Sequence, residues 1–229
     1  MIISIKVRLE PNNKQNSKMF QSAGTARWSY NWALSKQQEN YNQGNKFLRD
    51  GVLRKELTQL KKTDKFSWLK HYSNNITKQA IKDCCNAYKN FFKGLAEPPK
   101  FKSRKKSKPS FYQDTAKIKF TSTHVRLEKI GWIRLSERNR IPIDTKYMNP
   151  RISFNGVHWF ISVSVEIENI KPKLTSESIG IDLGIKDLAI CSNGMTFKNI
   201  NKTSKVKKLE KKMRRLQRRV SKKYQLNKK

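Results

Sequence analysis

The strongest constraint on this chain is its charge, because 51 Lys and Arg residues face only 17 Asp and Glu residues. The formal net charge of +34 over 229 residues implies a self-repulsion that destabilises a compact state unless a polyanion neutralises it. Phosphate backbones do so and release condensed counterions as they bind. The composition therefore predicts a nucleic-acid-binding protein.

A folded core is expected in spite of this charge. The hydrophobic fraction is 36% and the aromatic fraction 10%, whereas disordered polycations are poor in aromatic residues. No stretch approaches the roughly 18 apolar residues of a membrane-spanning helix, and residues 1–6 lack the apolar region of a signal peptide. We expect no membrane partner and no small-molecule substrate, and a location in the bacterial cytosol or nucleoid.

The three cysteines predict neither a disulfide framework nor a zinc site. Cys84 and Cys85 are adjacent, and no Cys-x-x-Cys pair occurs in the chain. Free cysteines of this kind usually pack as small hydrophobic residues. The three histidines are scattered without metal-ligand spacing, so we assign them no role.

The hydrophobic period divides the chain into segments. Residues 3–9 alternate as a strand, and from about residue 14 the period becomes helical. Helices are expected from there to about residue 34, over 53–61 and over 77–92. Pro98 and Pro99 end this helical block. Residues 100–109 follow with six basic side chains, and such a run predicts a loop.

Residues 110–170 return to the period of strands. A short strand is expected at 131–135, and Asn155-Gly156 predicts a hairpin with a type I′ turn. Its second arm places Trp159 and alternate residues on an apolar face, which is typical of a small antiparallel sheet or barrel. Residues 178–185 predict a nearly continuous apolar strand and 188–191 a second one, followed by a basic helix with a heptad-like apolar seam.

Asp182 is the first candidate for chemistry. A carboxylate centred in an apolar strand is costly to bury unless it is paired or coordinates a metal, and flanking Gly180 and Gly184 allow another backbone or a phosphate to approach. The alternative is a structural aspartate at a strand end or turn. Metal-assisted phosphodiester cleavage uses two divalent ions about 4 Å apart held by several carboxylates. One aspartate cannot hold them, and Asp187 is a doubtful second ligand.

The basic segments are the candidate phosphate contacts, which position a backbone without reading its sequence. The alternative is a solvated charged face. Trp28, Tyr30, Trp32 and Phe101 could stack on unpaired bases, although core packing is the expected role of the aromatics in the helical block. The predicted contacts are Arg27, Lys100, Lys102, Arg104, Lys105, Lys106, Lys108, Lys211, Lys212, Arg214, Arg215, Arg218 and Arg219.

Several blocks of sequence resemble one family when taken in order. Residues 179–189 (IGIDLGIKDLA) with Ser192-Asn193-Gly194 are similar to the first catalytic segment of a RuvC-type nuclease in the TnpB (OrfB) proteins of bacterial insertion sequences, relatives of the type V CRISPR effectors. The other blocks are 24–34 (GTARWSYNWAL), 57–62 (LTQLKK), 68–69, 79–80, 87–92 (AYKNFF), 99–103 (PKFKS) and 131–133 (GWI).

The resemblance implies an α+β fold. A small wedge-like β-barrel (residues 1–13 and 110–175) would be interrupted by a helical recognition block (14–109), and an incomplete RNase H-like RuvC domain with a basic helix (176–229) would follow. It also implies a guide RNA from the element's own end, a double-stranded DNA target and magnesium-dependent cleavage. Asp182 would be the first catalytic carboxylate and a Mg²⁺ ligand.

The family's later catalytic Glu and Asp and its zinc ribbon have no counterpart here, because Glu210 lies on a basic helix without a partner acid. We therefore expect a truncated nuclease that does not cleave DNA alone and holds no zinc. Two alternatives remain: a nuclease-inactive, RNA-guided DNA-binding module that acts like a repressor, and a general basic RNA-binding protein such as a ribosome-associated one.

Overall fold

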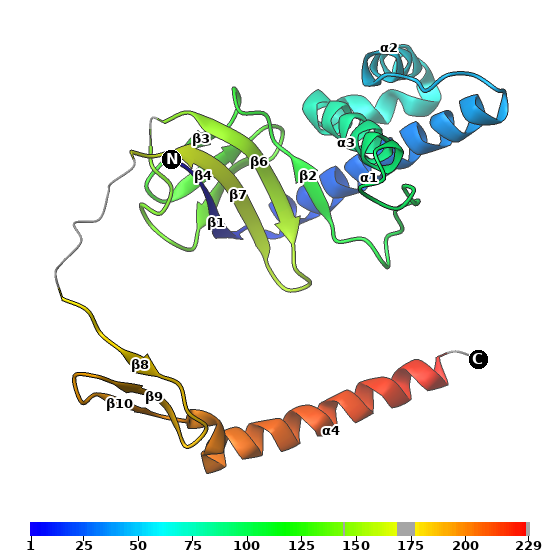
Figure 1. Ribbon diagram of the computed structural model, residues 1–229. Coiled ribbons are helices and arrows are strands. Elements are labelled where there is room, and N and C mark those ends of the chain that lie inside the picture. Colours follow the sequence, from blue (N-terminus) through cyan, green and yellow to red (C-terminus); the bar gives the residue numbers. More distant parts are fainter. Residues whose placement is uncertain (144, 169–176, 228–229) are drawn as a thin grey trace. The chain divides into compact units, whose positions relative to one another are not determined.

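The computed structural model describes residues 1–143, 145–168 and 177–227, and the chain divides into two compact units, Met1–Asn169 and Ile170–Lys229 (Figure 1). The predicted boundary between residues 175 and 176 lies outside the described residues. Both units combine helices with antiparallel strands, as the expected α+β class requires.

The elements of the first unit are β1 (Ile2–Glu10), α1 (Asn13–Asn42), α2 (Asp50–Leu60), the 3-10 helix η1 (Asp64–His71), α3 (Asn74–Phe92), β2 (Ser110–Tyr112), β3 (Lys119–Phe120), β4 (His124–Leu127), β5 (Gly131–Leu135), β6 (Tyr147–Phe154) and β7 (Trp159–Glu166). The second unit contains β8 (Ile181–Asp182), β9 (Asp187–Cys191), β10 (Thr196–Lys198), the 3-10 helix η2 (Ile200–Lys202) and α4 (Ser204–Leu226).

A seven-stranded antiparallel sheet forms the first unit's larger core, with the order β2-β6-β7-β1-β5-β4-β3. β1 pairs with β7 from Ile2 to Leu9 and with β5 at Leu9 and Glu10. Along β7 the alternate residues Trp159, Ile161, Val163 and Val165 are buried, which confirms the predicted apolar face. Closure into a barrel is not confirmed, because no ladder between β2 and β3 is found among the described residues.

The hairpin between β6 and β7 forms as predicted, but the predicted type I′ turn is wrong. Such a turn needs positive φ at both central residues, and only Gly156 has it, at 105°. The loop instead spans four residues from Asn155 to His158. The Asn155 side chain accepts hydrogen bonds from the backbone N–H groups of Val157 and His158, at 2.9 and 2.8 Å, so a local side-chain contact determines the turn.

The three predicted helices form a second core. α1 begins at a capping box in which Asn12 and Gln15 each bond the other's backbone N–H. Tyr30 is buried in this core, while Trp28 and Trp32 pack against it, so core packing of these aromatics is confirmed. All three cysteines are free and buried, as expected.

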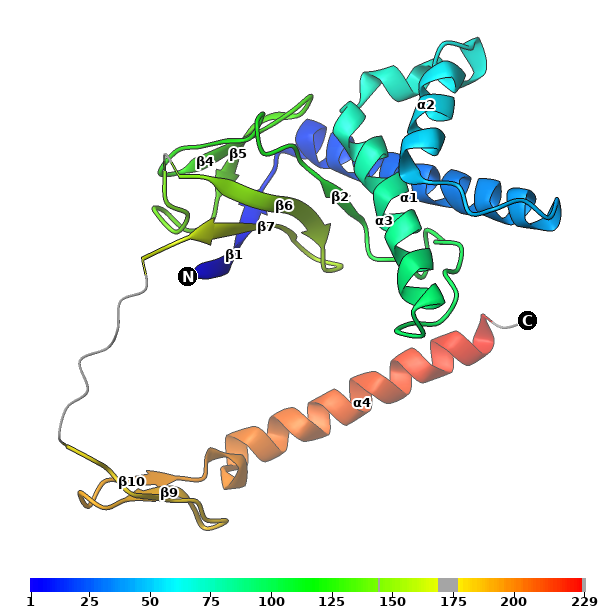
Figure 2. The ribbon, with the colours of Figure 1, turned by 45° about the horizontal axis from the view of Figure 1, so that its top comes forward.

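Polar contacts join the helices to the sheet. Trp159 donates from Nε1 to Asn16 Oδ1 at 2.8 Å, and Gln15 donates to the Trp132 carbonyl at 2.6 Å. α3 is joined to β6 by a bidentate ion pair, because Arg151 Nη1 and Nη2 each lie 2.9 Å from an oxygen of Asp83. The positions of α1 and α3 beside β2 and β6 can be followed in two views (Figures 1 and 2).

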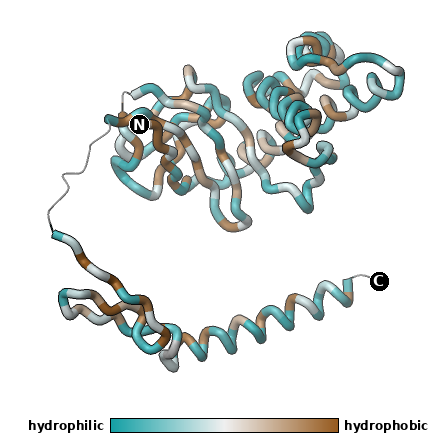
Figure 3. Tube along the Cα trace, in the orientation of Figure 1, coloured by the Kyte–Doolittle hydropathy of each residue, from teal (hydrophilic) through white to brown (hydrophobic). Residues whose placement is uncertain are grey.

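The second unit has a three-stranded sheet in the order β10-β9-β8 and the long helix α4. β8 is only two residues long, so the predicted continuous strand at 178–185 is wrong in extent. The apolar residues of that predicted strand, Ile181, Leu183 and Ile185, are exposed among the described residues. The seam of α4 is present as a repeated apolar stripe (Figure 3), and its residues Leu209, Met213, Leu216 and Val220 are about half exposed. Across the described part of the chain, no helix is long and apolar enough to cross a membrane.

Candidate nucleic-acid interface

Residues 100–109, here called the basic loop, connect α3 to β2 without helix or strand, as predicted. The Asn31 side chain on α1 holds the loop's start, because its Nδ2 donates to the Lys102 carbonyl at 2.9 Å and its Oδ1 accepts from the Lys102 N–H at 2.8 Å. At the other end, the Phe154 N–H donates to the Pro109 carbonyl at 2.9 Å. The loop is thus attached to both the helical block and the sheet.

A groove of about 590 Å³ runs between α1, the basic loop and the β6–β7 turn. We call it the loop groove. Five of the predicted contacts line it, and no acidic residue is found among its described lining residues. These five are Arg27 from α1 and Arg104, Lys105, Lys106 and Lys108 from the loop.

The loop groove also contains aromatic surface. Phe20 on α1 is 40% exposed and packs edge-on against Phe154 and Trp159, with ring centroids 5.0 and 4.9 Å apart. An aromatic ring held beside cationic side chains offers both of the contacts that an unpaired nucleotide uses, stacking for the base and charge for the phosphate.

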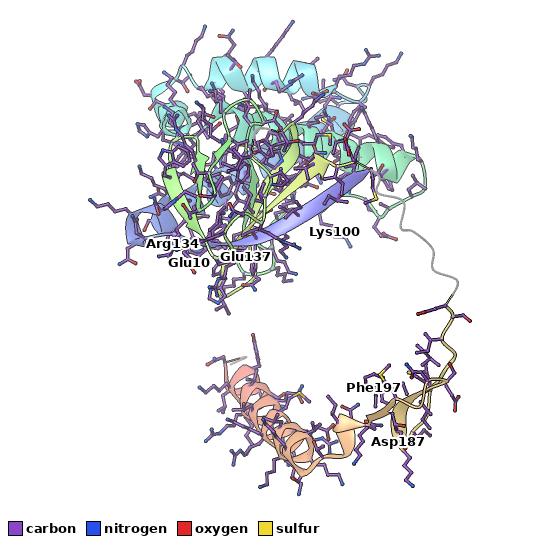
Figure 4. The ribbon with its side chains drawn as sticks, turned by 90° about the vertical axis from the view of Figure 1, so that its left-hand side faces the viewer. Glu10, Lys100, Arg134, Glu137, Asp187 and Phe197 are labelled. Atoms are coloured by element: carbon purple, nitrogen blue, oxygen red, sulfur yellow. The ribbon has the colours of Figure 1, made fainter. Side chains whose placement is uncertain are left out.

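Lys102 has a partly structural role. Although the residue remains exposed, its ammonium lies 3.7 Å from the centre of the Tyr30 ring. Desolvation there lowers the pKa of Lys102, and the charge of nearby Asp83 opposes this effect. Lys102 lines a smaller cavity of about 190 Å³ that shares Arg27 and Lys108 with the loop groove. Lys100, labelled in Figure 4, is not among the described lining residues of either space.

The remaining predicted cations lie in the second unit. Lys211, Lys212, Arg214, Arg215, Arg218 and Arg219 are all exposed on α4. α4 has no buried residue among those described and contains one acid, Glu210. Its cations therefore form a solvated basic surface rather than the wall of a cavity.

Asp182 is the last residue of β8 and is exposed. The sequence argument for a metal or ion partner assumed a buried carboxylate, so it does not apply to this arrangement. Its Cα partner across the hairpin is Ile190. Asp187 begins β9, opposite Lys198 of β10, on the same hairpin as Phe197 (Figure 4). Gly184 permits the tight connection between the strands, because a Cβ there would lie 2.9 Å from the Asp187 carbonyl.

The described residues do not fit a magnesium pair. No group of three or more His, Cys, Asp or Glu side chains is found among them, and two metal ions need several carboxylates. Asp182 can supply one carboxylate to such a centre but cannot form it.

Sequence reasoning missed several residues that border this surface. Gln79, Asp83 and Arg151 line the smaller cavity, and Phe20 and Phe154 line the loop groove. Phe20 lies in the helix predicted from about residue 14, and Arg151 lies in the strand-period segment 110–170, but neither was assigned to a site. Their spacing carries no signal of a site, since they meet only when α1, α3 and β6 pack together.

Two models of known protein families match this chain, one at each end. A helix-turn-helix domain of the OrfB type from IS605 matches residues 1–46, and the IS605 OrfB family described as "Probable transposase" matches residues 162–229. Residues 1–46 form one strand and one helix, β1 and α1, so a helix-turn-helix is not completed within the matched range.

Two curated relatives match most of the chain. "Putative RNA-guided DNA endonuclease InsQ" of Escherichia coli (strain K12) is 34% identical over 221 residues, which is 96% of this chain and 54% of InsQ. "Putative RNA-guided DNA endonuclease" of Streptomyces pristinaespiralis is 26% identical over 202 residues, 86% of this chain and 49% of the relative. The chain thus spans about half the length of these relatives.

A solved structure, the cryo-EM structure of the Cas12f1–sgRNA–target DNA complex, aligns with 97% of this chain and 62% of its own chain at 12% identity. The TM-score of 0.40 is too low to establish a common fold. The likeness that carries weight is instead in the sequence. Both ends of this chain match models of the IS605 OrfB family, and nearly its whole length is similar to InsQ.

Proposed function

We propose that this chain is the nucleic-acid-binding portion of a transposon-encoded, RNA-guided DNA endonuclease, and that the loop groove is its main phosphate contact. The observation that carries this proposal is the loop groove itself, where five cations from α1 and the basic loop converge without an acidic residue in the described lining. The two curated relatives, each named as an RNA-guided DNA endonuclease, support the same function.

The chemistry of the groove favours backbone contacts over base readout. Arg and Lys side chains neutralise phosphates and fix the register of a bound strand, but they carry no sequence information directly. Phe20 adds a stacking surface that accepts any base. Such a site would hold a guide RNA or target DNA in place, while pairing between guide and target would read the sequence.

The finer domain assignment is part of this proposal. Residues 1–13 and 110–175 would form a wedge-like barrel domain, residues 14–109 the recognition block, and residues 176–229 the opening of an RNase H-like RuvC domain. The strongly basic α4 would contact the same nucleic acid. The guide would come from the end of the chain's own element, and the DNA target would be double-stranded.

Asp182 would be the first catalytic carboxylate of the whole endonuclease, and magnesium its metal. Because the described donors do not form a metal centre, we derive no cleavage step from these residues. The same donor set favours a second candidate function, a nuclease-inactive RNA-guided binder. Incubating the purified 229-residue chain with RNA, target DNA and Mg²⁺ tests this second candidate, because cleavage that Asp182→Asn abolishes would exclude the binder.

The loop groove is tested by removing its charge. We expect the variant Arg104→Gln, Lys105→Gln, Lys106→Gln, Lys108→Gln to weaken RNA binding and to reduce the steepness of log K against log salt by up to about 3.6, since each phosphate contact contributes roughly 0.7 to 0.9. Fluorescence anisotropy between about 50 and 200 mM salt measures this slope.

A matched control removes the same number of charges from exposed lysines outside the groove, at Lys46, Lys55, Lys82 and Lys93. The proposal requires a clearly smaller change in the control. Equal losses in both variants would mean that net charge alone drives binding, and the loop groove would have no special role.

A further inference from the structure

A second basic groove lies on the helical block, away from the basic loop. It has a volume of about 300 Å³ and lies between α2, η1 and α3. We call it the lysine groove. Leu57 and Ile81 contribute buried apolar surface to its lining. Five cations line it, and its described lining contains no acid: Arg54, Lys61, Lys62, Lys70 and Lys78.

Lys61 is fixed in position within this groove. Its ammonium donates to Asn74 Oδ1 and to Thr77 Oγ1, both at 2.9 Å, and Thr77 in turn donates to the Asn74 carbonyl at 2.9 Å. The cation is therefore held between the end of α2 and the first turn of α3. Two of its three donors are used by neutral oxygens, which leaves its charge unbalanced.

Four of the five cations of the groove are uncompensated. Among the described residues, Arg54 pairs with Asp50 at 3.1 Å, whereas Lys61, Lys62, Lys70 and Lys78 have no ion pair. Burial lowers the pKa of Lys61, and the charge of Lys78 lowers it further. A partly buried cation without a counter-ion is costly, and a bound anion would offset that cost.

The lysine groove is distinct from the loop groove. On α3, Asn74, Thr77, Lys78 and Ile81 line the lysine groove, whereas Ile76, Gln79, Ala80 and Asp83 line the cavity that adjoins the loop groove. With 3.6 residues per turn, these two sets occupy opposite faces of the helix. One phosphate-binding surface on each side of α3 would let the helical block contact nucleic acid twice.

We propose that the lysine groove is a second phosphate-binding site, which takes consecutive phosphates of a nucleic-acid backbone. This inference extends the proposed nucleic-acid binding to a surface that the basic loop does not reach. Five cations from three elements are arranged along a groove, which suits a chain of phosphates better than a single one. Lys61 would take the most buried phosphate, and Lys62, Lys70 and Lys78 its neighbours.

The test uses two exposed lysines, so that folding is preserved. Lys62→Gln, Lys78→Gln removes one groove cation from the turn that follows α2 and one from α3, and both side chains are exposed. The matched control Lys55→Gln, Lys82→Gln removes two exposed cations outside the groove, one from α2 and one from α3. Each variant loses the same charge, and thermal unfolding of both checks the fold.

Binding is measured by anisotropy with two labelled probes, a short RNA strand and a short DNA duplex, and inorganic pyrophosphate is added as an unlabelled competitor. We expect the groove variant to lose about 2 from the salt slope with at least one nucleic acid, about 1 for each phosphate contact, while the control loses clearly less. Displacement of the labelled nucleic acid by low concentrations of pyrophosphate, lost in the groove variant, would instead identify a site for a small phosphate and overturn the backbone assignment.

Identical slopes for the groove variant and its control would overturn the inference. The proposed function would still stand after that result if the loop-groove variant binds RNA more weakly than its own matched control. Failure of both groove variants to differ from their controls would reject the proposed function as well.

Discussion

Replacing Asn31 with alanine tests whether the basic loop must be held in place before it binds nucleic acid. The Asn31 side chain makes two hydrogen bonds to the backbone of Lys102, at 2.9 and 2.8 Å. No charge is removed by Asn31→Ala, so any loss of affinity reports the position of the loop cations rather than their number.

The magnitude follows from these two bonds. Each is worth about 0.5 to 1.5 kcal/mol net, so the anchored loop is favoured by about 2 kcal/mol. If nucleic acid must bring the basic loop back to its anchored position without these two hydrogen bonds, the binding affinity falls by up to about 30-fold, at 1.36 kcal/mol per tenfold. The remaining attachment, from Pro109 to Phe154, and the contact of Lys102 with Tyr30 keep the loss below this limit.

The assay combines RNA anisotropy at several salt concentrations with hydrogen exchange of the Lys102 amide. We expect faster exchange, weaker binding and an unchanged salt slope, because every phosphate contact can still form. Asn40→Ala is the control, since Asn40 also bonds a loop carbonyl, that of Lys46 at 2.6 Å, outside the loop groove. Wild-type affinity in Asn31→Ala despite faster amide exchange would refute the need for a preformed loop.

Two further predictions concern stability. Asp83→Asn breaks the ion pair with Arg151, and because both side chains are partly exposed we expect the free energy of unfolding to fall by about 1 kcal/mol. That loss lowers Tm by about 2 to 4 °C, and additive effects in a double-mutant cycle with Arg151→Gln would contradict it. Burial alone would raise the pKa of the Glu128 carboxyl, but hydrogen bonds from Lys117 and Ser73 lower it overall. Its stabilisation is therefore present above the ordinary pKa of about 4.3 and is lost as pH falls through the lower folded value; urea midpoints should depend less on acid pH in Glu128→Gln, and an unchanged dependence would contradict this.

The sequence predicted the elements well where hydrophobic period decides the structure. The three predicted helices form α1, α2 and α3, and β7 buries alternate residues from Trp159 to Val165. The turn type at Asn155 was wrong because the asparagine side chain caps the loop's own backbone. A dipeptide preference does not include that competing contact.

The grooves could not be predicted from the sequence, because their residues come together only when the helices and the sheet pack. The basic loop was identified from its charge, but its convergence with Arg27 depends on how α1 passes beside β6 and the loop. Lys61, Lys62 and Lys78 are ordinary surface lysines in the sequence, and they form a groove only because α2 packs on α3. Asp182 shows the opposite case, since an apolar pattern predicted burial and the described residues leave it exposed.

The most direct test of RNA-guided binding is to express the chain together with its native flanking DNA, purify it at moderate salt and sequence the RNA that remains bound. We predict one strongly enriched transcript from the end of the element, with enrichment reduced in the loop-groove variant and retained in its matched control. Bulk ribosomal and transfer RNA in every sample would contradict the account and would mean that the charge of +34 alone drives binding.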